Sequence, residues 1–83
     1  MACDIMVVRI SARREMSTEV QEVLSRFGCC IRVRLGLHDA SSACSDEGLL
    51  VLQLSGEHSE MQGLEDALNS LSSVKAKMVS LDG

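Results

Sequence analysis

The sequence contains no proline, tryptophan or tyrosine, and Phe27 is its only aromatic residue. Without proline, every strand and helix can donate all of its backbone N–H groups. A core without aromatic clusters must be built from Leu, Val, Ile and Met. Readers of single-stranded RNA, which stack bases on aromatic side chains, are disfavoured by the same absence. The chain has 83 residues, and we expect residues 1–83 to form one small domain.

An excess of positive charge is also missing, because 8 Lys and Arg face 12 Asp and Glu, a formal net charge of −4. Direct binding of nucleic acid needs surplus cations to neutralise phosphates, so we expect no nucleic-acid partner. No apolar run approaches the ~18 residues of a membrane span, and no basic and apolar leader follows Met1. We therefore expect neither a signal peptide nor a membrane partner, and a cytoplasmic location.

The four cysteines show no C-x-x-C spacing, and the adjacent Cys29 and Cys30 would point to opposite faces of one strand. Without a secretory leader we expect reduced thiols with structural roles and no resident cofactor. His38 and Cys44, between two predicted strands, are candidate soft-metal ligands, and His58 is a third. The simpler interpretation is that these are solvated residues.

Six segments have the spacing of regular structure, in the order strand, helix, strand, strand, helix, strand: residues 4–12, 17–27, 29–37, 49–55, 59–71 and 74–81. This order predicts an α+β fold, a ferredoxin-like βαββαβ sandwich with both helices on one face of a four-stranded antiparallel sheet. The first and third strands are apolar on both faces, whereas the others are half polar. Doubly apolar strands belong in the centre, which agrees with the strand order 4-1-3-2 of this fold.

Local signals give the expected helix ends. Ser17 or Thr18 is expected to cap the first helix, and Ser59 the second, because each pattern has capping-box spacing. Gly28 stands where a left-handed residue would end the first helix. Gly63 lies inside the second helix and is expected to weaken it.

One face of the sheet is expected to have no helix over it. Its centre should present four apolar residues, Ile5, Val7, Leu49 and Val51. It should be framed by five cations, Arg9, Arg32, Arg34, Lys75 and Lys77. A monomer rarely leaves such a patch in water, so we expect a homodimer or homotetramer through this face. The alternative is that the long segment between the second and third strands folds over it.

A resemblance is carried by residues 19–37, EVQEVLSRFGCCIRVRLGL, and continues through Ser55-Gly56-Glu57 to Val74-Lys75. Over roughly Ile5 to Leu81 the chain resembles the family of iron-only hydrogenase system regulators. That family is similar to ACT domains and to the C-terminal domain of the nickel-responsive repressor. The resemblance implies an oligomeric, ligand-sensing module linked to the assembly or control of an iron hydrogenase.

ACT-like modules place effectors where subunits meet near loop ends, and the resemblance points to five residues here: Arg13, Arg14, Arg34, Gly36 and His38. The arginines favour a small anionic ligand, and Gly36 would allow close backbone approach. The alternatives are that Arg13 and Arg14 are solvated loop charges, and that Gly36 marks a β-bulge.

No Ser-His-Asp or Cys-His arrangement has support in the sequence, so we expect no catalytic residues and no enzyme. The predicted function is that of a non-enzymatic regulatory domain that senses a ligand as a homo-oligomer. Two alternatives remain open. One is a metal- or redox-sensing protein that uses His38 and the cysteines, and the other is an assembly scaffold without any ligand.

Overall fold

The computed structural model describes residues 4–11, 13–37 and 48–81 of the chain. Its strands and helices follow the predicted order: β1 (Asp4–Ile10), α1 (Arg13–Arg26), β2 (Ile31–Leu37), β3 (Gly48–Leu54), α2 (His58–Asn69) and β4 (Val74–Ser80). A short 3-10 turn, η1 (Gly28–Cys30), separates α1 from β2.

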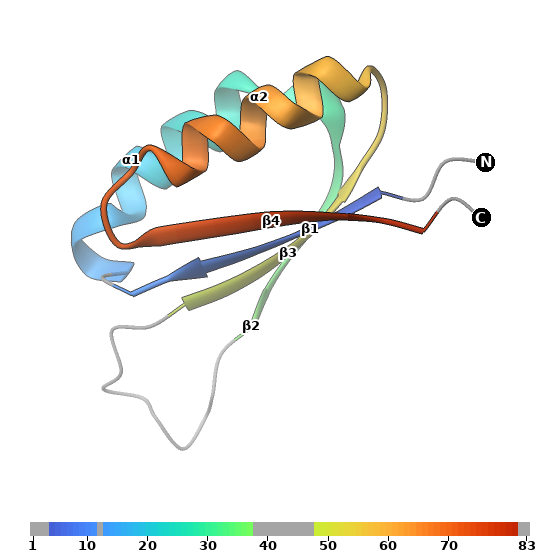
Figure 1. Cartoon of the computed structure of the whole chain (residues 1–83). Coiled ribbons are helices and arrows are strands. Elements are labelled where there is room, and N and C mark those ends of the chain that lie inside the picture. Colours follow the sequence, from blue (N-terminus) through green and yellow to red (C-terminus); the bar gives the residue numbers. More distant parts are fainter. Residues whose placement is uncertain (1–3, 12, 38–47, 82–83) are drawn as a thin grey trace.

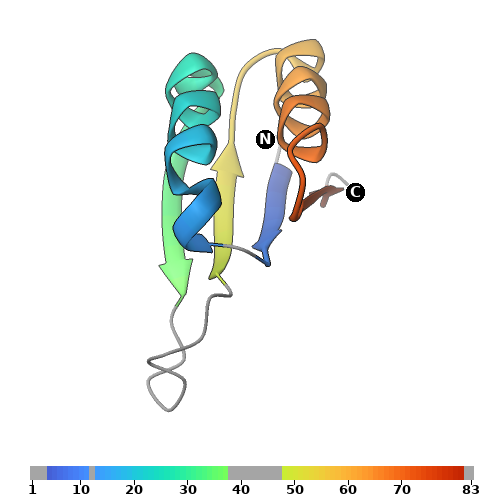
Figure 2. The ribbon, with the colours of Figure 1, turned by 90° about the vertical axis from the view of Figure 1, so that its left-hand side faces the viewer.

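The strands form one antiparallel sheet in the order β2-β3-β1-β4, which is the predicted order 4-1-3-2 read from the other edge. Both helices lie on the same side of this sheet (Figure 1). Figure 2 shows them side by side, α1 over the β2 side and α2 over the β4 side. The ferredoxin-like α+β sandwich is confirmed, and the other side of the sheet has no described helix over it.

The core lies between the sheet and the two helices. On α2, Met61, Leu64 and Leu68 are buried at spacings of three and four residues, which puts them on one face of the helix. The buried residues from the other elements are Met6, Val8, Ile10, Val20, Val23, Leu24, Cys30, Leu52, Leu54 and Val74. The core is therefore aliphatic and sulfur-rich, as the scarcity of aromatic residues requires.

Phe27, the one aromatic side chain, packs against this core where α1 ends. A Cβ built on Gly63 of α2 would lie 3.1 Å from Cε1 of Phe27. The glycine lowers the helix propensity of α2, but it makes room for the ring. Close packing therefore accounts for a glycine in the middle of this helix.

Both helices begin earlier than predicted. α1 begins at Arg13 rather than Ser17, and α2 begins at His58 rather than Ser59. The capping roles expected for Ser17, Thr18 and Ser59 are therefore wrong, because these residues already lie inside the helices. No helix in residues 4–11, 13–37 or 48–81 is long and apolar enough to cross a membrane.

The connection from α1 to β2 also differs from the prediction. Gly28 does not end α1 in a left-handed conformation but begins η1, and the positive φ of 96° belongs to Gly56, between β3 and α2. Cys29 and Cys30 lie in η1 rather than on a strand, with Cys29 exposed and Cys30 buried. The two thiols therefore have different environments, as expected, but because of their places in a tight turn rather than on a strand.

β2 then begins with an irregularity. Ile31 lies opposite Leu54, yet Val33 lies opposite Gln53, so Arg32 is an extra residue in the pairing with β3. Such a β-bulge reverses the alternation of the residues that follow it. Without the bulge, the side chains of β2 would alternate regularly from Ile31 onwards. Because of the bulge, each side chain after Arg32 lies on the opposite face of the sheet from the one that this alternation gives.

Candidate functional site

The side of the sheet away from the helices, called the open face below, is apolar in its centre. Ile5 and Val7 of β1 and Leu49 and Val51 of β3 share this face, and Val7 lies directly opposite Val51. Val7 is 38% exposed and Leu49 37%, while Ile5 and Val51 are half-buried. The four residues predicted to mediate association therefore lie together at the surface. Their covering by a second copy remains a prediction.

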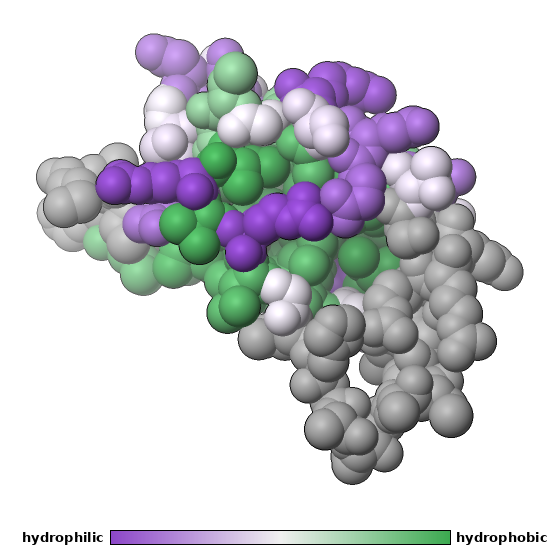
Figure 3. Space-filling view, turned by 180° about the vertical axis from the view of Figure 1, so that it is seen from behind, coloured by the Kyte–Doolittle hydropathy of each residue, from purple (hydrophilic) through white to green (hydrophobic). Residues whose placement is uncertain are grey.

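β2 extends this apolar surface in a way that the sequence analysis missed. Leu35 lies opposite Val51 and Val33 opposite Gln53, and the two side chains are 55% and 53% exposed. Figure 3, seen from behind, shows hydrophobic residues that reach the surface among strongly hydrophilic ones. The larger patch could not be found from alternation, because only the bulge determines which face Val33 and Leu35 occupy.

Arg34 was expected to frame the open face, and this prediction is wrong. It lies opposite the buried Leu52, and its Nη1 donates a hydrogen bond to Oε1 of Gln21 on α1 at 3.0 Å. The physical reason is again the bulge at Arg32, which turns Arg34 to the helix side of the sheet.

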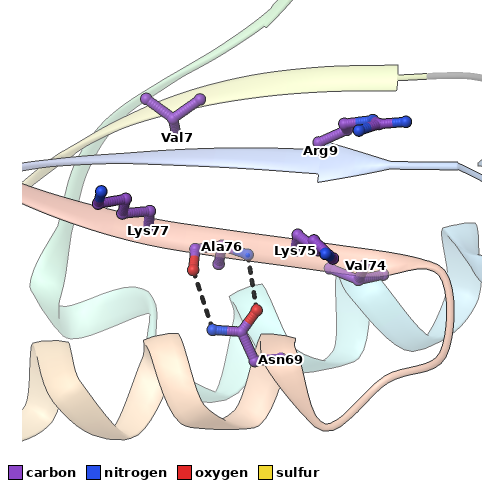
Figure 4. Close-up of a pocket in the computed structure, with 7 residues that line it drawn as sticks. All are labelled: Val7, Arg9, Asn69, Val74, Lys75, Ala76 and Lys77. Atoms are coloured by element: carbon purple, nitrogen blue, oxygen red, sulfur yellow. Dashed lines mark hydrogen bonds between the residues drawn. The ribbon is translucent and has the colours of Figure 1, made fainter.

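Three cations of the predicted frame do lie on the open face, and we call Arg9, Lys75 and Lys77 the basic trio. Arg9 lies directly opposite Lys75, and Lys77 lies opposite Val7. The trio and Val7 line an open hollow of about 520 Å³, which continues round the edge of β4 to Asn69 (Figure 4). Within the described ranges, no carboxylate forms an ion pair with the trio.

The outer edge of β4 is closed by side chains of α2. The N–H of Ala76 donates to Oδ1 of Asn69 at 2.7 Å, and Nδ2 of Asn69 donates to the carbonyl of Ala76 at 2.9 Å (Figure 4). Glu65 accepts the N–H of Met78 through Oε2 at 2.6 Å. Asn69 thus forms the hydrogen bonds that a neighbouring strand would form with β4, so another chain cannot pair with β4 at Ala76.

Two of the residues predicted to bind an effector, Arg34 and Gly36, lie on β2, at the edge of the sheet opposite to β4. Arg13 and Arg14 form the first turn of α1 rather than a loop before it. Gly36 lies opposite Leu50 in regular pairing, so the alternative of a bulge at Gly36 is wrong. His38 lies outside the described residues. An effector role for Arg13, Arg14, Arg34, Gly36 and His38 stays a prediction.

The metal-ligand candidates His38 and Cys44 both lie outside the described residues. In the part of the chain that the structure describes, no group of three or more His, Cys, Asp and Glu could hold a metal ion. Cys30 is fully buried, and its Sγ lies 3.3 Å from the carbonyl of Phe27 as a donor. Burial, helped by the negative charge of Glu60, raises the pKa of this thiol, so Cys30 is a neutral core residue at neutral pH.

Three solved structures show how widely this fold occurs. An uncharacterised protein of Thermotoga maritima has a TM-score of 0.83 at 22% identity, over 99% of this chain and 100% of its own. The ACT domain from GTP pyrophosphokinase of Chlorobium tepidum has a TM-score of 0.68 at 16% identity, over 95% of this chain and 97% of its own. CPII of Thiomonas intermedia K12 is a nitrogen regulatory PII-like protein bound to ADP, AMP and bicarbonate. It has a TM-score of 0.63 at 5% identity, over 99% of this chain and 97% of its own.

These similarities show that the chain shares the ferredoxin-like fold of ACT domains and PII-like proteins. No protein-family model matches the sequence, and the comparison with curated proteins gives no match.

Proposed function

We propose that the chain is a small regulatory domain without catalytic activity, which senses a ligand and works as a homo-oligomer. The open face is the observation that carries this proposal, because Val7, Val33, Leu35 and Leu49 are all more than a third exposed. Contiguous apolar surface of this kind marks an interaction site. A symmetric pair would cover it economically, because each copy offers the same self-complementary patch.

The fold supports a regulatory role, since it is shared with an ACT domain and with a PII-like protein whose structure holds nucleotides and bicarbonate. The open face itself offers apolar and basic side chains. Such groups bind anions and hydrophobic surfaces. We therefore propose binding of a small anion rather than catalysis, in the cytoplasm, where an exposed thiol such as Cys29 stays reduced.

The regulated process is proposed from the sequence alone. The resemblance of residues 19–37 to iron-only hydrogenase system regulators suggests the assembly or control of an iron hydrogenase. Removing the gene in the source organism should change hydrogenase activity, and wild-type protein should restore it. Unchanged activity would contradict the process but not the proposed association.

Association is tested by Val51→Lys, which places a charge in the middle of the open face. We expect the wild type to be a dimer or tetramer at micromolar concentration by multi-angle light scattering, and the variant to be a monomer. Leu35→Lys makes the same test at a side chain that is 55% exposed, where the fold tolerates a charge.

Gln62→Lys is the matched control, because it adds the same charge at an exposed position of α2 on the other side of the sheet. It should leave the oligomer unchanged. Circular dichroism shows that each variant is folded. A wild type that is monomeric at all concentrations tested would contradict the proposal.

A further inference from the structure

We propose that the basic trio, Arg9, Lys75 and Lys77, binds a small organic diphosphate on the open face, and that this anion supplies the counter-charge for tight self-association. The inference rests on the proposed function, because it locates the ligand on the surface through which the copies pair. The proposed site differs from the one expected from the sequence, two residues of which, Arg34 and Gly36, lie on β2 at the other edge of the sheet.

The trio is a concentration of like charge in a chain whose net charge is −4. Arg9 and Lys75 are directly opposite each other on neighbouring antiparallel strands, where Cβ atoms lie about 4.5–5.5 Å apart. Lys77 follows two residues along β4 on the same face, roughly 7 Å from Lys75. Like charges so placed repel each other, and a bound anion removes that repulsion.

Among the residues that the structure describes, the strands direct no acidic side chain to the open face that could neutralise the trio. Apart from apolar side chains and the trio itself, the regularly paired residues of the described strands direct only the neutral Gln53 to this face. In a symmetric pair each copy contributes the same surface, so a second copy brings three more cations and no carboxylate from these strands. Burying unpaired cations is strongly unfavourable, and an anion held between the copies offsets this cost.

The shape of the site suits a diphosphate with an apolar part. The hollow of about 520 Å³ is open and extends round the edge of β4 to Asn69, so it suits a small ligand that stays partly exposed. Figure 4 shows Val7, Arg9, Lys75 and Lys77 projecting to the same side of the sheet. The spacing of the two lysines fits two linked phosphoryl groups, and Arg9 can hold a phosphate with two parallel hydrogen bonds. Val7 contributes an apolar side chain to the lining beside them.

Isothermal titration calorimetry with pyrophosphate and with ADP, at constant ionic strength, tests the site. The site variant is Lys75→Gln with Lys77→Gln. Its control is Arg32→Gln with Arg34→Gln, which removes the same charge from β2. We expect the site variant to weaken binding of both probes by about ten-fold or more, and the control by less than about three-fold. ADP should bind more tightly than pyrophosphate.

Four results of this titration would overturn all or part of the assignment. Equal loss in the two double variants would show a general effect of charge. Loss in the β2 variant alone would favour the effector site predicted from Arg34. If the wild type binds neither probe, the trio is not a binding site for this class of anion. If ADP and pyrophosphate bind equally tightly, the site does not recognise an organic part of the ligand.

Sedimentation velocity tests the link to association. ADP should tighten wild-type self-association by about ten-fold or more, because ligand and partner then stabilise the same state. The Lys75→Gln, Lys77→Gln variant should associate without ADP at least as tightly as the wild type, and ADP should have no effect on it. A stable dimer that ignores ADP overturns this inference but leaves the proposed function standing. A monomer with and without ADP contradicts both.

Discussion

Asn69→Ala removes both hydrogen bonds that close the edge of β4 at Ala76. A hydrogen bond contributes about 0.5–1.5 kcal/mol net, and the exposed backbone groups of Ala76 regain water when it is lost. Two such bonds therefore amount to about 2 kcal/mol. Alanine is a better helix former than asparagine by about 0.5 kcal/mol, which offsets part of this loss even though Asn69 is the last residue of α2. The free energy of unfolding should fall by about 1–1.5 kcal/mol.

The measurement is urea unfolding followed by circular dichroism, with protein concentration held fixed because association raises apparent stability. In a thermal melt the same change should lower the Tm by about 5–10 °C for a domain of this size. Gln62→Ala is the control, because Gln62 also makes two side-chain hydrogen bonds from α2, to Glu65 and Asp66. These bonds join neighbouring turns of one helix, where each such pair contributes about 0.2–0.5 kcal/mol.

The comparison separates closure of the sheet edge from an ordinary surface contact. If Asn69→Ala costs no more than Gln62→Ala, then the Asn69 amide does not stabilise β4, and the reasoning is refuted. Loss of the two hydrogen bonds has a second consequence. The opened edge exposes an N–H and a carbonyl at Ala76, so the variant should aggregate faster than the control at high concentration.

Cys29 is expected to react with a thiol reagent in the folded protein and Cys30 only after unfolding, which peptide mapping after brief alkylation would show. Burial raises the pKa of Cys30 in the folded state. The buried neutral thiol therefore contributes fully to stability below the ordinary thiol pKa of about 8.5, and this contribution falls as the pH rises through the raised value. The difference in unfolding free energy between the wild type and Cys30→Ala should therefore narrow towards about pH 10, and a constant difference would argue against the burial of the thiol. Gly56→Ala should lower stability by about 1–2 kcal/mol in urea unfolding, because its φ of 96° is unfavourable for a residue with a Cβ; an unchanged midpoint would show that the turn can adopt another conformation.

Sequence patterns were enough to predict the order of the elements, the strand order of the sheet and the composition of the core. β1 and β3 carry apolar residues on both faces, with Asp4, Arg9 and Gln53 as the polar exceptions, and such strands belong in the centre of a sheet. The same alternation put Val7 and Val51 on the face away from the helices, because Met6 and Leu52 on the other face are fully buried. These features follow from a period of two residues, which is a local property of the chain.

The neighbours of the side chains on the edge strands depend on tertiary packing and could not be predicted from the sequence. The bulge at Arg32 depends on how η1 enters the sheet, and it reversed the faces of Leu35 and Arg34. Asn69 reaches Ala76 only because the turn after α2 folds the helix back along β4. Arg9 meets Lys75 because strands from opposite ends of the chain pair in one register. Contacts between residues distant in sequence depend on chain connections and packing, which local periodicity does not encode.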